Sequence, residues 1–302
     1  MLNIILTNTN YDEKIFDDEY FIWGMRIPTP FIENIKKVFD VNNLKKYENL
    51  DKKIKINMVE TCSNVIGLPP PENYDIKQLS LNIDSNEIVI RHGDSKNSNY
   101  HGLYKYGKRY NIGFFAHQTF QVGWGRPEPL DLVNGAGDII NIFCPIRNYL
   151  NLNEFEWFYS KNTHDMWAIL HPELYRNLAY ILIYYYTKIH NTTFENMKKY
   201  KQLLNKNVNK TFAKGTTPFP TAGLFQIFIG IYVSKNVYIY GANLEEKTFD
   251  KFPIGPPHCL KSEKSFLRDL VNKNMDHIPK KYFPFDLNNK SDELYREIHV
   301  VF

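Results

Sequence analysis

The histidine at position 258 has a sequence setting suited to proton transfer. It follows the turn-forming residues 252–257, which end in two prolines, and it precedes a helical segment that contains Glu263. The prolines restrict the backbone before the histidine, and an imidazole with a pKa of about 6.5 can accept a proton at neutral pH. His258 is therefore a candidate general base. The alternative is an exposed loop histidine with no catalytic role.

A second candidate site is the start of an apolar helix expected over residues 221–233. Pro220-Thr221-Ala222-Gly223 begins this segment, and a strand-like run at residues 237–240 follows it and ends in Gly241. Thr221 can cap the helix, whose first N–H groups lack intrahelical partners and lie at the positive end of the helix dipole. Such a helix start can bind a phosphate or a carboxylate. An ordinary capped helix packed on a sheet would have the same sequence.

A third candidate is an acidic turn that leads into a strand ending in Arg91. Arg91 could hold a phosphate, or it could pair with Asp84 or Asp94. No Asp-x-Asp pattern stands beside a strand in a metal-binding setting, so we expect no divalent metal site and no cofactor. The sequence also contains no Walker A, GxGxxG, GxSxG or HExxH pattern, which argues against the common nucleotide-binding and hydrolase classes.

Short β-branched runs alternate with helical segments along the chain. Strands are predicted at residues 54–59, 87–91, 111–115, 139–144, 167–171 and 237–240, and helices at residues 172–189, 192–205, 221–233 and 261–274. Several of the strands are continuous apolar runs, as parallel strands covered on both faces require. This alternation predicts an α/β fold with a Rossmann-like, doubly wound and mostly parallel sheet.

Composition limits the classes of protein to which the chain can belong. Its 302 residues suit one large α/β domain or two small ones, and the net charge of +4 is too mild to indicate nucleic-acid binding. The aromatic content of 15% suits ring stacking on sugars or bases, although an A+T-rich genome would also produce it. Three cysteines without CxxC spacing indicate neither a disulfide framework nor a zinc site, and favour a reducing compartment.

The apolar runs do not indicate targeting to a membrane or to the outside of the cell. The N-terminal residues lack a basic region before their short apolar run, so no signal peptide is expected. The longest apolar stretches, near residues 178–186 and 222–233, are too short to span a bilayer. We therefore expect a cytoplasmic protein without a transmembrane segment, either free or peripheral to a membrane.

Read in order, these pieces resemble the sialylmotifs of the animal sialyltransferase family. The family's large motif resembles residues 56–59, Thr61-Cys62-Ser63, Ile83-Asp84-Ser85, residues 88–91, Gly107 and residues 111–115. Its middle segment resembles Ile169-Leu170-His171-Pro172, its small motif resembles Pro220-Thr221-Ala222-Gly223 through Gly241, and its very small motif matches His258 and Glu263. A bacterial sialyltransferase family is similar in the same way. The likeness covers residues 54–270 and implies a glycosyltransferase-A-like variant of the fold, as sialyltransferases have.

The chain departs from the animal family's pattern at four places. Thr61-Cys62-Ser63, with Asn64 adjacent, replaces a Gly-Asn-Ser turn, and Arg91-His92-Gly93 replaces Arg-x-Asn. The family's cysteine pair is missing, since Ser234 stands where one cysteine is expected. Its aromatic third motif is not visible in residues 251–257.

The resemblance implies an inverting, metal-independent transfer of sialic acid, or a similar nonulosonic acid, from a cytidine monophosphate (CMP) sugar to a glycan or glycolipid hydroxyl. His258 would be the catalytic base, and Asp84 and Glu263 would support the local structure. Trp124 would contact the acceptor, and the long loops at residues 93–109 and 118–137 are candidates for a lid. The donor would contact Cys62, Ser63, Asn64, Arg91, Gly93, Thr221, Ala222 and Gly223.

We expect a single domain over residues 1–302, with an N-terminal extension (1–53), a nucleotide-sugar-binding and catalytic core (54–275) and a C-terminal segment (276–302). Three alternatives remain open. The donor could be another CMP-sugar such as CMP-Kdo, or the chain could be a non-catalytic homologue that binds a glycan or a nucleotide. An unrelated structural protein, for example a viral shell component, would have a β-sandwich in place of a parallel sheet.

Overall fold

The computed structural model describes residues 5–6, 58–66, 70, 72–92, 107, 109, 111–116, 140–144, 166–170, 172–193, 220–242 and 260–301. Within these residues, eight strands form one sheet in the order β1-β6-β5-β4-β3-β2-β7-β8. They are β1 (Ile5–Leu6), β2 (Val59–Val65), β3 (Ile88–His92), β4 (Ile112–Ala116), β5 (Ile140–Cys144), β6 (Met166–Leu170), β7 (Ser234–Tyr240) and β8 (Glu297–Val300). Strands β2 to β8 are parallel, and β1 pairs antiparallel with β6.

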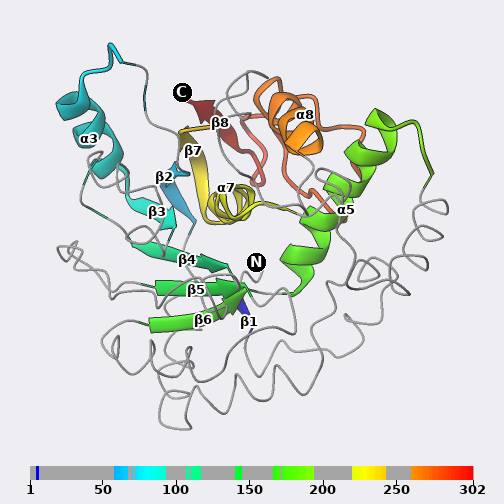
Figure 1. Ribbon diagram of the computed structural model, residues 1–302, viewed down its shortest axis with the longest axis horizontal. Helices are drawn as coiled ribbons and strands as arrows, with labels where there is room; N and C mark the ends of the chain where they lie inside the picture. The colour runs from blue at the N-terminus through cyan, green and yellow to red at the C-terminus, as the bar shows by residue number, and fades with distance from the viewer. Residues whose placement is uncertain are drawn as a thin grey trace, which may run out of the picture.

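Helices lie on both faces of this sheet. They are α3 (Ile76–Asp84), α5 (Pro172–Ile189), α7 (Ala222–Val233) and α8 (Leu260–Val271). Figure 1 shows α3 on one side of the sheet and α7, with α5 and α8 beyond it, on the other. The expected α/β, Rossmann-like fold with a mostly parallel sheet is therefore confirmed for the described part of the chain. None of the described helices is both long enough and apolar enough to cross a membrane.

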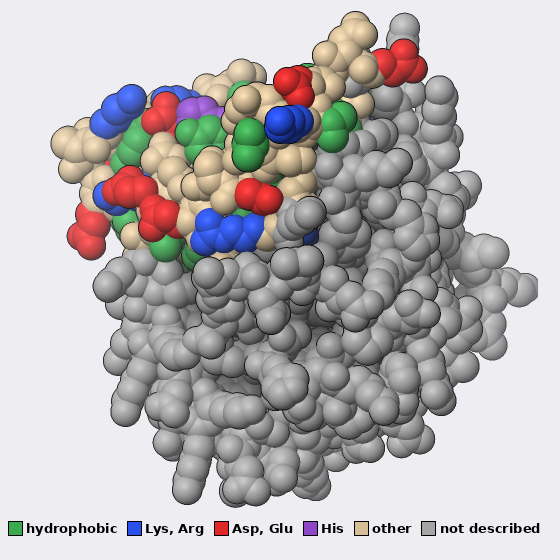
Figure 2. All heavy atoms as spheres, turned by 90° about the vertical axis from the view of Figure 1, so that its left-hand side faces the viewer, with side chains coloured by type: hydrophobic (Ala, Val, Ile, Leu, Met, Phe, Trp, Pro, Cys, Tyr) green, Lys and Arg blue, Asp and Glu red, His purple; other side chains and the backbone are tan. Residues whose placement is uncertain are grey.

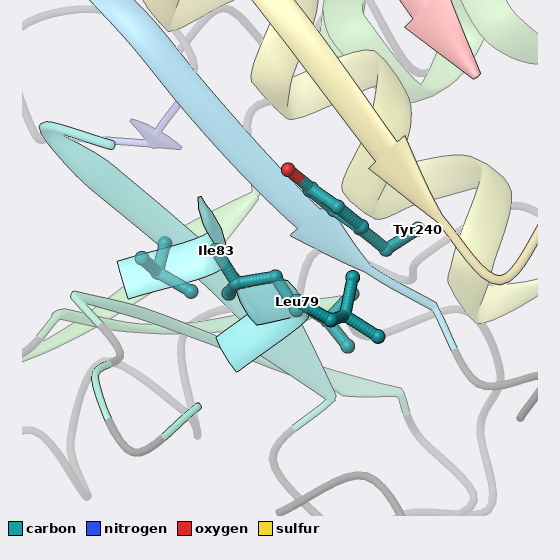
Figure 3. Packing of buried hydrophobic residues seen from close by; sticks show 5 residues of the cluster. Leu79, Ile83 and Tyr240 are labelled. Carbon is teal, nitrogen blue, oxygen red and sulfur yellow. The ribbon is translucent and has the colours of Figure 1, made fainter. Parts of the chain in front are cut away.

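Side chains of the central strand β2 alternate between the two helical layers. Val65 packs in a cluster with Leu79 and Ile83 of α3, and Tyr240 of β7 completes this side of the core (Figure 3). The neighbouring Asn64 points the other way, because a Cβ atom added to Gly230 of α7 would collide with its side-chain amide. Successive residues of a strand face opposite sides of a sheet, so β2 is buried between α3 and α7.

Both helices that cover β2 begin at a polar cap. Asp75 accepts hydrogen bonds from the N–H groups of Lys77 (2.9 Å) and Gln78 (3.1 Å) at the start of α3, and Thr221 caps α7. Such a cap typically stabilises a helix by about 1 kcal/mol. The two caps fix where each helix begins relative to the end of the strand beside it.

The sequence prediction placed the strand before α3 too early in the chain. It was expected at residues 54–59 with a turn at Thr61-Cys62-Ser63, but β2 runs from Val59 to Val65 and those three residues lie inside it. The turn prediction is wrong because small polar residues are tolerated in a central strand when their side chains find partners. Ser63 Oγ, for example, donates to the carbonyl oxygen of Ile83 at 3.2 Å.

The C-terminal part of the chain also joins the sheet, which the sequence did not predict. Strand β8 pairs in parallel with β7, and Arg296, directly before it, is 3% exposed. Arg296 Nε donates to the carbonyl oxygen of Ile231 in α7 at 2.8 Å, and its guanidinium lies 4.7 Å from the centre of the Phe285 ring. Burial lowers the pKa of Arg296 to about 10, so the side chain stays charged at neutral pH. This hydrogen bond links the start of β8 to the last turn of α7.

Candidate functional site

The order of the strands reverses at β2, which defines a candidate site. From β2 the chain continues through β3, β4, β5 and β6 on one side, and β7 and β8 lie on the other side of β2. In open parallel sheets of this kind, ligands bind beyond the carboxyl ends of the strands at such a switch point. A ligand site is therefore expected beyond Val65 of β2 and Tyr240 of β7.

The start of α7 lies at this edge of the sheet. The helix passes directly into β7, Val233 being followed by Ser234, so its first turn is near the end at which β7 finishes. A Cβ atom added to Gly223 would lie 3.4 Å from Cβ of Ile66, the residue after β2. Ile66 N in turn donates to the carbonyl oxygen of Tyr240 at 3.0 Å. The helix start predicted from sequence thus meets the ends of both switch-point strands.

Two N–H groups at the start of α7 have no acceptor among the described residues. Thr221 Oγ1 accepts from Leu224 N at 3.2 Å, and the Thr221 carbonyl oxygen accepts from Phe225 N at 3.1 Å. Within the described residues, no atom accepts a hydrogen bond from the N–H of Ala222 or Gly223, and both residues are partly exposed. With the positive end of the helix dipole behind them, these two donors form an anion-binding arrangement.

Glu263, in the first turn of α8, holds the cap of α7 in place. Its carboxyl oxygens accept hydrogen bonds from Thr221 N and from Thr221 Oγ1, each at 2.7 Å, and the residue is only 6% exposed. Burial raises the pKa of Glu263 to about 8, although the hydrogen bonds from Thr221 act in the opposite direction. At pH 7 the neutral form of the group therefore predominates. A neutral carboxyl leaves the positive helix end available to an anionic ligand.

Arg91 and Asp84 lie on the opposite face of the sheet from this helix start. Arg91 follows Val89 by two residues and therefore shares the α3 face with it. Its Nη2 is 3.8 Å from Asp84 Oδ1, and its Nε donates to the carbonyl oxygen of Arg109 at 2.9 Å. Of the two roles considered for Arg91, the structure shows the pairing with Asp84. This pair joins α3 and β3 to Arg109.

Gly107 allows this ion pair to form. It has a positive φ of +90°, a backbone conformation that residues other than glycine rarely adopt. A Cβ atom at this position would also lie 2.9 Å from Arg91 Nη2 and 3.0 Å from Asp84 Cγ. The Arg109 side chain continues the network, because its Nη1 donates to the carbonyl oxygen of Asn86 at 2.7 Å. These contacts link α3, β3 and Arg109 within the fold.

Cys62, Ser63 and Asn64 are fully buried inside β2, at 0% exposure. Asn64 Nδ2 donates to Cys62 Sγ at 3.3 Å, and burial raises the pKa of the Cys62 thiol to about 12, so the sulfur is neutral. None of these three side chains reaches the edge where the strands end. The residues that do reach it are Val65 and Ile66.

Three of the expected site residues, His258, Gly93 and Trp124, lie outside the described residues, as do both expected lid loops apart from Gly107 and Arg109. The structure therefore brings together Thr221, Ala222, Gly223 and Glu263, and it separates Arg91 and Asp84 from them. Sequence reasoning did not single out Ile66 or Gln226. The signal for Gln226 was available, because it is a lone amide within the apolar run at residues 224–233.

Charged side chains of the described residues are distributed as follows with respect to metal and nucleic-acid sites. Among the described residues, no group of three or more His, Cys, Asp or Glu side chains could hold a metal ion. On the described part of the face in Figure 2, which includes the α3 side, acidic and basic side chains are interspersed with apolar ones. A nucleic-acid interface usually concentrates basic residues on one face.

The chain matches no protein-family model, and a search of curated proteins found no match. The grounds for assigning a function are therefore the geometry of the site and the order of the motifs.

Proposed function

We propose that the chain is a metal-independent, inverting glycosyltransferase that transfers sialic acid, or a similar nonulosonic acid, from a CMP-sugar to a glycan or glycolipid hydroxyl. The observation that carries this proposal is the pair of N–H groups of Ala222 and Gly223 at the switch point of the sheet, for which the described part of the chain offers no acceptor. Negative charge builds on the CMP phosphate as it leaves. Preorganised amides and a helix dipole stabilise such charge, a task for which other glycosyltransferases use a metal ion.

The support of the helix start suits this role. Glu263 orders Thr221 through two short hydrogen bonds, and its raised pKa keeps it mostly neutral. An ionised carboxylate in this position would repel the phosphate. We therefore assign Glu263 a positioning role, in which it holds the first turn of α7 without taking part in proton transfer.

The proposed base is His258, which would take the proton from the acceptor hydroxyl as the sugar is transferred. It stands two residues before Leu260, the first residue of α8, and two peptide units span at most about 7 Å. The first turn of α8 touches the cap of α7 through Glu263 and Thr221. The proposal requires this contact between the two helix starts, because the base and the leaving group must lie on the same side of the molecule. The finer assignment to the glycosyltransferase-A-like variant of the fold belongs to the same proposal.

The first test measures which nucleotide the protein binds and which donor it turns over. CMP should raise the melting temperature more than UDP, GDP or CDP, because binding to the native state stabilises it. CMP release from CMP-sialic acid should then exceed release from CMP-Kdo. Turnover of CMP-Kdo alone would replace the donor and keep the mechanism, whereas equal stabilisation by all four nucleotides would contradict the proposed site.

A matched pair of histidine variants tests the base. His258→Ala should lower transfer at least about 100-fold, the scale of general-base catalysis, and should leave CMP affinity within about threefold. His299→Ala is the control, because His299 stacks on Tyr238 of β7 at a ring distance of 4.6 Å, on the face that carries Tyr240 and α3. If His258→Ala transfers sugar as fast as the His299→Ala control, the base is a different residue.

A second candidate function is nucleotide or glycan binding without transfer. The burial of Cys62, Ser63 and Asn64 favours it, because it leaves no side chain of these three residues at the site to contact a donor. This version predicts saturable CMP binding with no CMP release from any CMP-sugar. The proposed enzyme predicts both CMP binding and CMP release.

A further inference from the structure

Gln226, in the second turn of α7, is a buried residue whose side-chain amide lacks hydrogen-bond partners among the described residues. It is fully buried, at 0% exposure, in a helix whose neighbouring residues are apolar. Within the described part of the chain, neither its Oε1 nor its Nε2 has a hydrogen-bond partner. Native proteins pair nearly all buried polar side chains, so an unpaired one requires an explanation. Leucine or methionine would fill the same place in a helix without leaving polar atoms unpaired.

The position of Gln226 on the helix relates it to the free amides. It follows Ala222 by four residues and Gly223 by three, so all three lie on the same side of α7. Long side chains in a helix point back toward its N-terminus. The amide of Gln226 is thus directed toward the end of α7 that presents the free N–H groups. If the phosphate of a ligand binds at that end, the ligand atoms next to the phosphate lie within about one helical turn, or 5 Å, of this amide.

We propose that Gln226 is a ligand-binding residue of this site, whose side-chain amide hydrogen-bonds the nucleoside attached to the phosphate held by Ala222 and Gly223. This inference rests on the proposed function and adds a residue to it. An amide offers both a donor and an acceptor, which suits a ribose hydroxyl or the polar edge of a pyrimidine. Since Gln226 is buried in the free protein, residues that cover it move when the ligand enters.

Other polar side chains of the interior differ from Gln226. Asn64 Oδ1 and Asn177 Oδ1 also lack partners among the described residues, but the Nδ2 atom of each makes a hydrogen bond, to Cys62 Sγ and to Tyr232 Oη respectively. Gln226 alone in this group has both ends unpaired. Its burial therefore destabilises the free protein, and a bound nucleoside would supply the missing partners.

The test compares two apolar substitutions with a control on the same helix. Gln226→Leu and Gln226→Met remove the amide, and Ile231→Val changes a buried residue near the other end of α7. Affinities for CMP, UMP, 2′-deoxy-CMP and inorganic phosphate are measured by calorimetry, and melting temperatures are recorded for all variants. If the amide binds the ribose, the wild type should bind 2′-deoxy-CMP less tightly than CMP; if it binds the base, CMP and UMP should differ.

We expect both Gln226 variants to bind CMP at least about tenfold more weakly, while inorganic phosphate binds within twofold of the wild type. We also expect their melting temperatures to rise by about 3 °C, because an unpaired amide has been removed. The Ile231→Val control should bind CMP normally. Stabilised variants that have lost nucleotide affinity show that the loss is not due to misfolding.

Three results would count against the inference, and they are distinguishable. If the wild type binds CMP and both variants bind it within twofold, Gln226 does not contact the ligand, while the proposed transferase stands. If the wild type shows no saturable binding of CMP or UMP, the inference and the proposed function fail together. A fall in melting temperature in both variants would also count against the inference, because the amide would then have partners in the free protein.

Discussion

At the scale of single residues, the carboxyl of Glu263 is the group whose charge most affects the candidate site. It is buried, it receives two 2.7 Å hydrogen bonds from Thr221, and no described cation lies within ion-pair distance of it. Burial without a compensating cation favours the neutral form. The same carboxyl therefore supports the helix cap and keeps negative charge away from the free N–H groups.

This predicts a specific dependence of stability on pH. The pKa of Glu263 is about 8 in the folded protein and near its ordinary value of 4.5 when unfolded. Between these values the folded state binds more protons, so the free energy of unfolding should fall as the pH rises from about 4.5 to 8 and then level off. Glu263→Gln cannot ionise and keeps the shape of the side chain. It should match the wild type at pH 5 and exceed its stability by about 3 kcal/mol, as an order of magnitude, at pH 9.

Urea denaturation of both proteins between pH 5 and pH 9 measures this difference directly. The difference in the free energy of unfolding should increase as the pH rises and should stay constant above pH 9. Wild-type and Glu263→Gln curves that run parallel over the whole range would mean that Glu263 titrates as an ordinary surface carboxyl.

At the scale of elements, the close approach of α7 to β2 positions the helix start. Gly230 faces Asn64, and a Cβ atom at Gly230 would collide with the Asn64 amide. Gly223, two turns earlier on the same side of the helix, lies against Ile66 at the end of β2. Two glycines on one face thus let the helix lie close to the strand, and this sets the position of the free N–H groups.

A double substitution tests this packing. Gly230→Ala alone should destabilise the protein by about 1–3 kcal/mol through overpacking. Added to Asn64→Ala, the same change should be neutral or stabilising, because the colliding amide is gone and alanine favours the helix over glycine by about 1 kcal/mol. Unfolding free energies of the two single variants and the double variant measure the coupling. Additive effects would mean that Gly230 and Asn64 do not touch.

Parts of the fold followed from sequence because the signals are local. Residues 172–189 were predicted as a helix and form α5, and Thr221 caps α7 as its sequence setting suggested. The extent of β2 did not follow, because Ser63 and Asn64 are residues that favour turns over strands. They are accommodated in the strand by helices packed on both faces. Strand β8 was also missed, because an alternation of polar and apolar residues over only four positions is a weak signal.

At the scale of the whole molecule, the candidate site exists because distant segments become neighbours. Thr61 of β2 pairs with Asn236 of β7, and together these strands form the switch point. No local pattern encodes this pairing, so the helix start could be predicted from sequence but the strand ends beside it could not. The two roles open to Arg91 could not be separated from sequence for the same reason. The choice depends on Asp84 and Arg109 meeting it in the folded chain.

The most direct test of the central claim removes one of the two free N–H groups without disturbing the helix. Ala222 is the first residue of α7, a position that proline favours, and Thr221 before it has φ −70° and ψ 159°, which a following proline tolerates. Ala222→Pro should therefore melt within about 2 °C of the wild type yet bind CMP at least about tenfold more weakly, while Ala222→Ser, which keeps the N–H, binds it normally. Normal CMP affinity in a stable Ala222→Pro protein would contradict the claim that this helix start holds the phosphate.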